Sequence, residues 1–219
     1  MTAARLVNLI GEGYENMASQ EPRRIASSEG LEGLSRAANE AGAGGRRLPP
    51  VLSWNPDYCG EIDMRIASDG TWFYNGTPIG RPALVKLFST ILRKDPERHV
   101  LVTPVERVGI KVDDAPFLAV GMERIEDERG PALRFRTNVD DFVTVDAEHP
   151  LRFEPGAADG IKPYVRVRHD LWALVKRALF YDLVDLGETR TVDGKDMFGV
   201  ASAGAFFPIA PAADVDAWR

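Results

Sequence analysis

The spacing of apolar residues predicts helices in three parts of the chain. Leu31, Leu34 and Ala38 lie at helical spacing and predict one helix near residues 28–41. A second apolar stripe begins after Pro82, a residue suited to the first turn of a helix, and continues through Leu92. A third stripe follows Asp170, a favoured capping residue, and predicts a helix over 170–183.

Elsewhere, apolar and polar residues alternate with a period of two, which is typical of strands with one buried face. Ile62, Met64 and Ile66 alternate with charged residues, and Asp69-Gly70 is a strong signal for the turn of a hairpin. The same alternation predicts strands at 71–74, 99–104, 107–112, 117–125, 132–138, 142–146, 151–153, 162–168, 189–192 and 196–201.

These elements predict an α+β fold with mainly antiparallel sheets and two related lobes. The tetrapeptide Ala-Leu-Val-Lys occurs at 83–86 and again at 173–176, each time in a predicted helix between strands, which suggests a duplicated strand–helix–strand unit. A single mixed domain is the alternative. The predicted organisation is an N-terminal tail with one docked helix (1–48), an N-terminal lobe (49–112), a C-terminal lobe (113–210) and a fraying tail (211–219).

Composition narrows the class of protein. The chain has 219 residues, of which 44% are hydrophobic and 27% charged, and these are ordinary globular values. Its net charge of −6 argues against unaided binding to nucleic acid or to an acidic membrane surface. A single cysteine, Cys59, excludes an intramolecular disulfide. Because neither a secretory signal nor an apolar run of about 20 residues is found, we expect a soluble cytoplasmic protein.

The common catalytic motifs are absent from the sequence. There is no phosphate-binding loop, no dinucleotide fingerprint and no nucleophile elbow. His99, His149 and His169 are far apart, so we expect no metal and no cofactor. His149 follows Asp146 and Glu148, but side chains at these spacings on an extended chain do not all converge, and a turn is the better interpretation. The sequence therefore favours a binding protein over an enzyme.

Aromatic residues in the first hairpin are candidates for ligand stacking. Trp72 and Tyr74 share one face of their strand, opposite Phe73. If Phe73 belongs to the core, Trp72 and Tyr74 form a platform close to Arg65, which suits a flat anionic ligand. Packing between the lobes is the alternative. Trp54, in the loop before the first strand, is a less certain third aromatic.

Two predicted strands carry a basic stripe on one face. If the two strands approach one another, their arginines form a local cationic surface that could bind phosphate or carboxylate. The alternative is a solvated sheet face balanced by the acidic runs at 126–128 and 140–141. The stripes consist of Arg134, Arg136 and Asn138 on one strand and of Lys162, Tyr164, Arg166 and Arg168 on the other.

Three runs of sequence carry a family resemblance. They are WNPDYCGEIDMRIASDGTWFYNGTPIGRPALVKLFSTIL, VTPVERVGIKVDDAPF and LRFRTNVDDFVTVDAEHPLRFE. On these runs the chain, from about Leu48 to Pro208, resembles the bacterial domain-of-unknown-function 1285 family. The resemblance implies a core built by duplication of an α+β unit and a C-terminal lobe superficially like pleckstrin-homology folds. It also implies a site for a nucleotide-type ligand between the lobes and a role in signalling, and it transfers no catalytic residues.

The leading hypothesis is a cytoplasmic binding protein that holds a small anionic, nucleotide-like ligand between its lobes. In this hypothesis arginines neutralise the phosphate of the ligand, two aromatic rings stack on its flat part, and a side-chain amide forms hydrogen bonds with its polar edge. The predicted ligand-binding residues are Arg65, Arg136, Arg166 and Arg168 for the charge, Trp72 and Tyr164 for stacking, and Asn138 for the polar edge.

Two alternatives remain open at this stage. The first is a protein–protein interaction module, in which the lobes pack tightly and a flat surface binds a partner chain. The second is a hydrolase or transferase whose catalytic groups, Asp63, Glu106 and His149, meet only in space. The sequence favours neither a membrane nor nucleic acid as a partner, and a protein partner is compatible with it.

Overall fold

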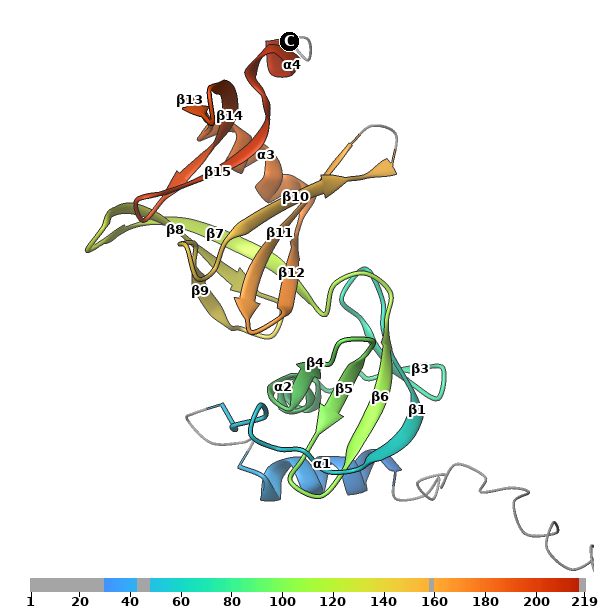
Figure 1. Cartoon of the computed structure of the whole chain (residues 1–219). Coiled ribbons are helices and arrows are strands. Elements are labelled where there is room, and N and C mark those ends of the chain that lie inside the picture. The colour runs from blue at the N-terminus through green and yellow to red at the C-terminus, as the bar shows by residue number, and fades with distance from the viewer. Residues whose placement is uncertain (1–29, 43–47, 158–159, 217–219) are drawn as a thin grey trace, which may run out of the picture.

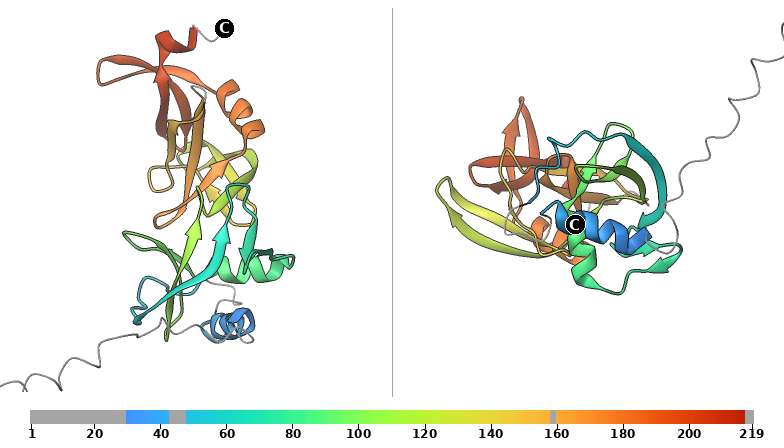
Figure 2. Two further views of the ribbon diagram at one scale, coloured as in Figure 1. Left: turned by 90° about the vertical axis from the view of Figure 1, so that its right-hand side faces the viewer. Right: turned by 90° about the horizontal axis from the view of Figure 1, so that it is seen from below.

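The computed structural model describes residues 30–42, 48–157 and 160–216, which form two lobes stacked along one axis (Figure 1). The helix α1 lies at one end of the molecule and α4 at the other (Figure 2). Strands dominate over helices, and the sheets are antiparallel or mixed. In the described part of the chain, no helix combines the length and the apolar character needed to cross a bilayer.

The N-terminal lobe is built on a six-stranded sheet with the order β3-β2-β1-β6-β5-β4. The central pair, β1 and β6, is parallel, and the other neighbours are antiparallel. Two helices pack against each other on this lobe. Its elements are α1 (Gly30–Glu40), β1 (Tyr58–Ile66), β2 (Trp72–Tyr74), β3 (Thr77–Pro78), α2 (Pro82–Thr90), β4 (Leu92–Lys94), β5 (His99–Val102) and β6 (Arg107–Val112).

The predicted helices of this lobe are confirmed with one correction. The first predicted helix is present as α1, and its predicted start at residues 28 and 29 lies outside the described residues. The second ends at Thr90, earlier than predicted, because Leu92 pairs with Leu101 of β5 and the Ile91 carbonyl accepts a hydrogen bond from the Val102 N–H. Pairing with β5 therefore outweighs the helical spacing of Leu92.

The C-terminal lobe contains a six-stranded sheet with the order β10-β11-β12-β7-β8-β9 and a three-stranded sheet β13-β14-β15. β12 runs parallel to β7 and leads directly into α3. The elements are β7 (Phe117–Asp127), β8 (Gly130–Thr137), β9 (Phe142–Thr144), β10 (Leu151–Pro155), β11 (Ile161–Arg168), β12 (Leu171–Val175), α3 (Arg177–Asp185), β13 (Glu188–Val192), β14 (Lys195–Ser202), β15 (Ala205–Pro211) and α4 (Ala212–Asp216).

The helix predicted over 170–183 is wrong in its first half. Residues 171–175 form β12, in which Leu171, Ala173 and Val175 are buried and alternate with half-buried neighbours. The turn before β12 places His169 at φ 48°, so Asp170 belongs to a hairpin and does not cap a helix. Where the sequence predicts a tail after residue 210, β15 continues to Pro211 and α4 follows it, and residues 217–219 lie outside the described residues.

This correction removes the sequence argument for duplication. The first Ala-Leu-Val-Lys, at 83–86, lies inside α2. The second, at 173–176, forms the end of β12 and the residue that precedes α3. The same four residues therefore adopt different secondary structures, and their identity carries no evidence for a repeated unit.

A single hydrophobic cluster passes through both lobes. In the N-terminal lobe, Trp72 stacks on Phe88 with ring centroids 6.5 Å apart. In the C-terminal lobe the cluster includes Phe117 and Phe135, both fully buried. Residues 113–116, which we call the connector, join the lobes between β6 and β7. Apolar packing across the junction thus holds the two lobes in contact.

Candidate functional site: a pocket between the lobes

The aromatic residues of the first hairpin face the opposite way to the prediction. Trp72 is 1% exposed and belongs to the core, so it offers no stacking face to a ligand. Phe73 points to the outer side, where the Arg65 guanidinium lies 4.6 Å from its ring centroid. Trp54 packs against the cluster of Val51, Val100 and Val102. Burial of the larger ring stabilises the lobe, and the predicted platform does not form.

The strands that carry the two basic stripes, β8 and β11, are not neighbours, because β7 and β12 lie between them in the sheet. The stripes approach the same turn at one end, where the partners of Arg136 and Arg168 are adjacent residues. Asn138 is exposed, and its Oδ1 accepts a hydrogen bond from the Leu118 N–H at 3.0 Å. The predicted arginines are each paired with a carboxylate: Arg65 with Asp113 at 2.6 Å, Arg136 with Asp140 at 3.1 Å, Arg166 with Asp170 at 3.4 Å, and Arg168 with Asp141.

Arg168 bridges the two lobes. Its guanidinium lies 4.8 Å from the ring centroid of Phe117 and pairs with Asp141 in the C-terminal lobe. The same group donates a hydrogen bond of 2.7 Å to the Ser89 carbonyl of α2, in the N-terminal lobe. Only 12% of the Arg168 side chain is exposed. This residue therefore connects the lobes and has little surface left for a ligand.

Tyr164 is tied to the connector. Its hydroxyl donates a 2.7 Å hydrogen bond to Asp114 Oδ1, and the Lys162 ammonium lies 2.6 Å from Asp114 Oδ2. Burial and the neighbouring Asp114 carboxylate raise the pKa of Tyr164. Burial alone would raise the pKa of Asp114, but the hydrogen bonds from Lys162 and Tyr164 hold it below its ordinary value. Asp114 is therefore ionised at neutral pH, and Tyr164 is a donor to it.

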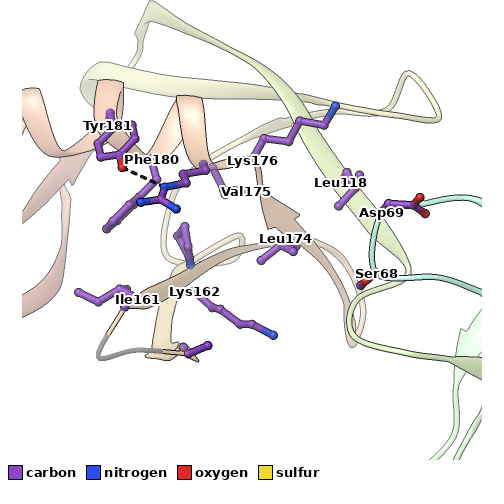
Figure 3. Close-up of a pocket in the computed structure, with 15 residues that line it drawn as sticks. Ser68, Asp69, Leu118, Ile161, Lys162, Leu174, Val175, Lys176, Phe180 and Tyr181 are labelled. Atoms are coloured by element: carbon purple, nitrogen blue, oxygen red, sulfur yellow. Dashed lines mark hydrogen bonds between the residues drawn. The ribbon is translucent and has the colours of Figure 1, made fainter.

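A cavity lies where the lobes meet, and we call it the interlobe pocket (Figure 3). Its volume is about 650 Å³, within the range usual for small-molecule sites. Ser68 and Asp69, in the turn between β1 and β2, line it from the N-terminal lobe. The C-terminal lobe supplies the apolar walls, formed by Leu118, Ile161, Leu174, Val175 and Phe180.

Two cations stand at the beginning of α3, on the wall of this pocket. Lys176 occupies the N-cap position without a side-chain capping bond, and Arg177 follows it. Arg177 donates a 2.9 Å hydrogen bond to the Tyr181 hydroxyl, and within the described part of the chain neither cation pairs with a carboxylate. The N–H groups in the first turn of a helix lack partners inside the helix. The beginning of α3 is thus a positively polarised end of the pocket.

The opposite side of the pocket carries a negative charge. Asp69 accepts a 2.9 Å hydrogen bond from the Thr71 N–H, and this bond lowers the pKa of Asp69. Figure 3 places Asp69 and Ser68 on one side and Phe180 and Tyr181 on the other. An anion is therefore favoured at α3 and disfavoured near the β1–β2 turn.

Sequence reasoning missed Lys176 and Arg177 because both fell inside the helix predicted over 170–183. Two signals could have located them. Leu171, Ala173 and Val175 alternate with a period of two, which predicts a strand ending at residue 175. Two adjacent basic residues then begin a shorter helix, where cations are unfavourable for helix stability. Two cations at the beginning of a helix therefore indicate a role other than stabilising that helix.

A second cleft, of about 410 Å³, also contacts both lobes. The Arg152 guanidinium lies there over the ring of Trp172, 4.2 Å from its centroid. Three carboxylates line this cleft, which therefore suits an anion less well than the interlobe pocket. Burial and the nearby Lys94 lower the pKa of His99 to about 4, so its imidazole is neutral at physiological pH. The carboxylates are those of Asp114, Glu154 and Asp170.

The residues of the enzyme alternative are not brought together. Asp63 lies within β1, Glu106 in the turn before β6, and His149 in the other lobe between β9 and β10. Asp146 accepts hydrogen bonds from the N–H groups of Glu148 and His149, which confirms the predicted turn. The side chains of Asp146 and His149 nevertheless converge within this turn, with Nδ1 3.2 Å from Oδ1, because the turn brings them together where an extended chain would not. Across the described ranges, no group of three histidine, cysteine or acidic side chains is arranged to hold a metal.

Two family models match the chain, and they meet inside the connector. The N-terminal domain of DUF1285, described as a domain of unknown function, matches residues 49–115. The C-terminal domain of DUF1285, described as a protein of unknown function, matches residues 116–209. The chain belongs to the DUF1285 family. This confirms the resemblance found in the sequence.

Solved structures of DUF1285 proteins are similar to this chain. A DUF1285 family protein from Silicibacter pomeroyi DSS-3 shares 46% sequence identity, with a TM-score of 0.72 over 81% of this chain and 97% of that one. A DUF1285 family protein from Shewanella baltica OS155 is 28% identical, with a TM-score of 0.45 over 56% of this chain and 90% of that one. No curated protein matches the chain.

Proposed function

We propose that this DUF1285 protein is a non-enzymatic, cytoplasmic binding protein with a role in signalling, and that it takes a small anionic ligand in the interlobe pocket. The observation that carries the proposal is the position of Lys176 and Arg177. Both line the pocket, and neither has a carboxylate partner among the described residues. The proposed site therefore uses other cations than the arginines that the sequence suggested.

The contrast with other basic residues supports this choice. Most lysines and arginines around the lobe junction are already neutralised, including Lys86 by Asp140 at 2.5 Å and Lys162 by Asp114. An anion that displaced such a partner would leave a carboxylate unpaired. At α3, by contrast, an anion gains two cations and the N–H groups of the first turn without breaking an ion pair.

The proposal also includes two features of the fold, a pleckstrin-homology-like C-terminal lobe and a duplicated α+β unit. We retain the pleckstrin-homology-like character of the C-terminal lobe, which is supported by a mainly antiparallel sheet with a helix following β12. We also retain duplication of an α+β unit as the family resemblance implied it. In each lobe one parallel pair of strands, β1–β6 or β7–β12, lies within an otherwise antiparallel sheet.

Thermal unfolding with a panel of nucleotides, cyclic nucleotides, inorganic phosphate and simple carboxylates tests the proposal. A ligand present at roughly 100 times its Kd stabilises the folded state by about 2.7 kcal/mol, which raises Tm by several degrees. The variant Lys176→Gln/Arg177→Gln should abolish the shift. The matched control is Arg36→Gln/Lys195→Gln, which removes the same charge at two exposed sites away from the pocket and should leave the shift intact.

The outcomes separate the competing functions. A saturable shift that depends on Lys176 and Arg177 supports the proposal. A shift that persists in the double variant places the ligand elsewhere and overturns the site. No shift with any compound, in a protein shown to be folded, rejects the small-ligand function and favours the protein–protein interaction module.

A further inference from the structure

The walls of the interlobe pocket are better suited to an apolar chain than to a nucleobase. Leu118, Leu174 and Val175 form an aliphatic surface between the beginning of α3 and the β1–β2 turn (Figure 3). Ile161 and Phe180 extend that surface. A nucleobase needs hydrogen-bonding groups along its edge, and an aliphatic wall supplies none of them.

Few uncharged side chains in the pocket could form hydrogen bonds with the polar edge of a nucleobase. Among the described residues that line it, the hydroxyl and carboxylate side chains are those of Ser68, Asp69 and Tyr181. The Tyr181 hydroxyl already accepts a hydrogen bond from Arg177, and the Asp69 carboxylate accepts one from Thr71. The neutral polar side chains available to the body of a ligand are thus Ser68 and the O–H donor of Tyr181.

The charges in the pocket favour a ligand with one anionic end. Lys176 is the N-cap and Arg177 the first residue of α3, and the Arg177 guanidinium lies beside Tyr181, whereas the ionised Asp69 lies on the side of the β1–β2 turn, towards which the Lys176 side chain extends (Figure 3). A second anionic group at the far end of the ligand would approach Asp69 and be repelled by it. A neutral, apolar far end meets no such penalty.

We propose that the ligand of the interlobe pocket is an apolar monoanion, such as a medium-chain carboxylate. Its head group binds Lys176, Arg177 and the first-turn N–H groups of α3, and its hydrocarbon body lies against Leu118, Leu174 and Val175. This inference rests on the proposed function and specifies the chemical class of its ligand. No covalent step is involved.

A homologous series of probes gives this inference a distinctive signature. Hexanoate, octanoate and decanoate are titrated into the full chain below their micellar concentrations, with heat of binding as the readout. Each added pair of CH₂ groups that becomes buried should tighten binding by roughly fifteenfold, since one CH₂ accounts for about fourfold. Octylamine tests the head group, and it should not bind because its charge matches that of Lys176 and Arg177.

Two variants locate the body and the head of the ligand separately. Leu174→Ser places a hydroxyl on the aliphatic wall and should weaken decanoate more than hexanoate. Because Leu174 is only half-buried, the lobe should tolerate this change. The control Leu52→Ser alters a leucine that is 60% exposed outside the pocket and should change neither affinity. Lys176→Gln/Arg177→Gln should weaken all three acids by a similar factor.

Failure of this inference is distinguishable from failure of the proposed function. If nucleotides or inorganic phosphate bind in a manner that requires Lys176 and Arg177 and the carboxylates do not, the site stands and the ligand class is overturned. If the carboxylates bind with no dependence on chain length or on Leu174, the aliphatic wall is not the binding surface, and the inference is again overturned. If no probe binds, both proposals are rejected.

Discussion

Asp113 and Asp114 are adjacent in the chain, yet their carboxylates are bound by different lobes. Asp113 pairs with Arg65 of β1 at 2.6 Å, in the N-terminal lobe. Asp114 binds Lys162 and Tyr164 of β11, in the C-terminal lobe. The connector is therefore fixed on both sides at neighbouring residues, and this limits rotation of one lobe against the other.

Asp114→Ala should lower the free energy of unfolding by about 1–3 kcal/mol, because it leaves the buried Tyr164 hydroxyl without an acceptor. Urea unfolding followed by fluorescence measures the loss. Asp113→Ala is the comparison, and it should cost less than about 1 kcal/mol, since its pair with Arg65 is more exposed. Equal losses for the two variants would contradict this account.

Arg168→Ala should destabilise the protein by about 2–4 kcal/mol, since Asp141 loses its partner and the Ser89 carbonyl loses its donor. Arg168→Lys should recover only part of this loss, because an ammonium lacks the fork that serves two acceptors at once. Denaturant unfolding provides the measurement. The control Arg134→Gln removes an exposed arginine paired with Glu123, and we expect a change below about 1 kcal/mol.

Stability should fall with acidification through the titration of His99. The pKa of this imidazole is about 4 in the folded protein, against an ordinary value of 6.5. Between these values the unfolded chain binds the additional proton, so the free energy of unfolding decreases as the pH falls from 6.5 towards 4. Urea midpoints at pH 7 and pH 5 should differ less in His99→Gln than in the native protein. An unchanged difference would mean that His99 is not responsible.

Trp72→Ala should cost about 3–5 kcal/mol, as expected for removal of a fully buried ring that stacks on Phe88. Thermal or urea unfolding measures the loss. Phe73→Ala, the neighbouring residue on the outer face, should cost clearly less because its ring is only half-buried. A larger loss of stability for Phe73→Ala than for Trp72→Ala would mean that Phe73 lies in the core and Trp72 on the outer face, as the sequence suggested.

Local signals in the sequence were sufficient for most strands. Ile62, Met64 and Ile66 follow the period of a strand, and Asp69-Gly70 forms the predicted turn with Gly70 at φ 80°. The errors fall where helical and strand spacing are both compatible with the residues. Leu92 and residues 171–175 could lie in either structure, and pairing with β5 and β7 decides between them. Such pairing joins segments that are distant in the chain, so the spacing of residues within one segment cannot predict it.

The candidate site was harder to predict than the fold. Arg136, Arg166 and Arg168 were correctly recognised as basic residues on strands, but their carboxylate partners come from turns whose position depends on the tertiary structure. Lys176 and Arg177 differ from them in having no carboxylate partner among the described residues. Charge pairing is a property of the folded chain, so composition and spacing could not separate these two residues from the others.

The parallel pairs in the two sheets also set an order for folding during synthesis. The N-terminal sheet is complete once β6 has been made, because β6 supplies the partner that β1 requires. Residues 117–119 of β7 cannot form their parallel pairing until β12 has been made, and β12 comes after β8 to β11 in the chain. Long-range pairing of this kind is slow, and domains made first generally fold first. The N-terminal sheet has all its strands before the second lobe has been made, and the contact between Arg168 and Ser89 forms after β11 has been made.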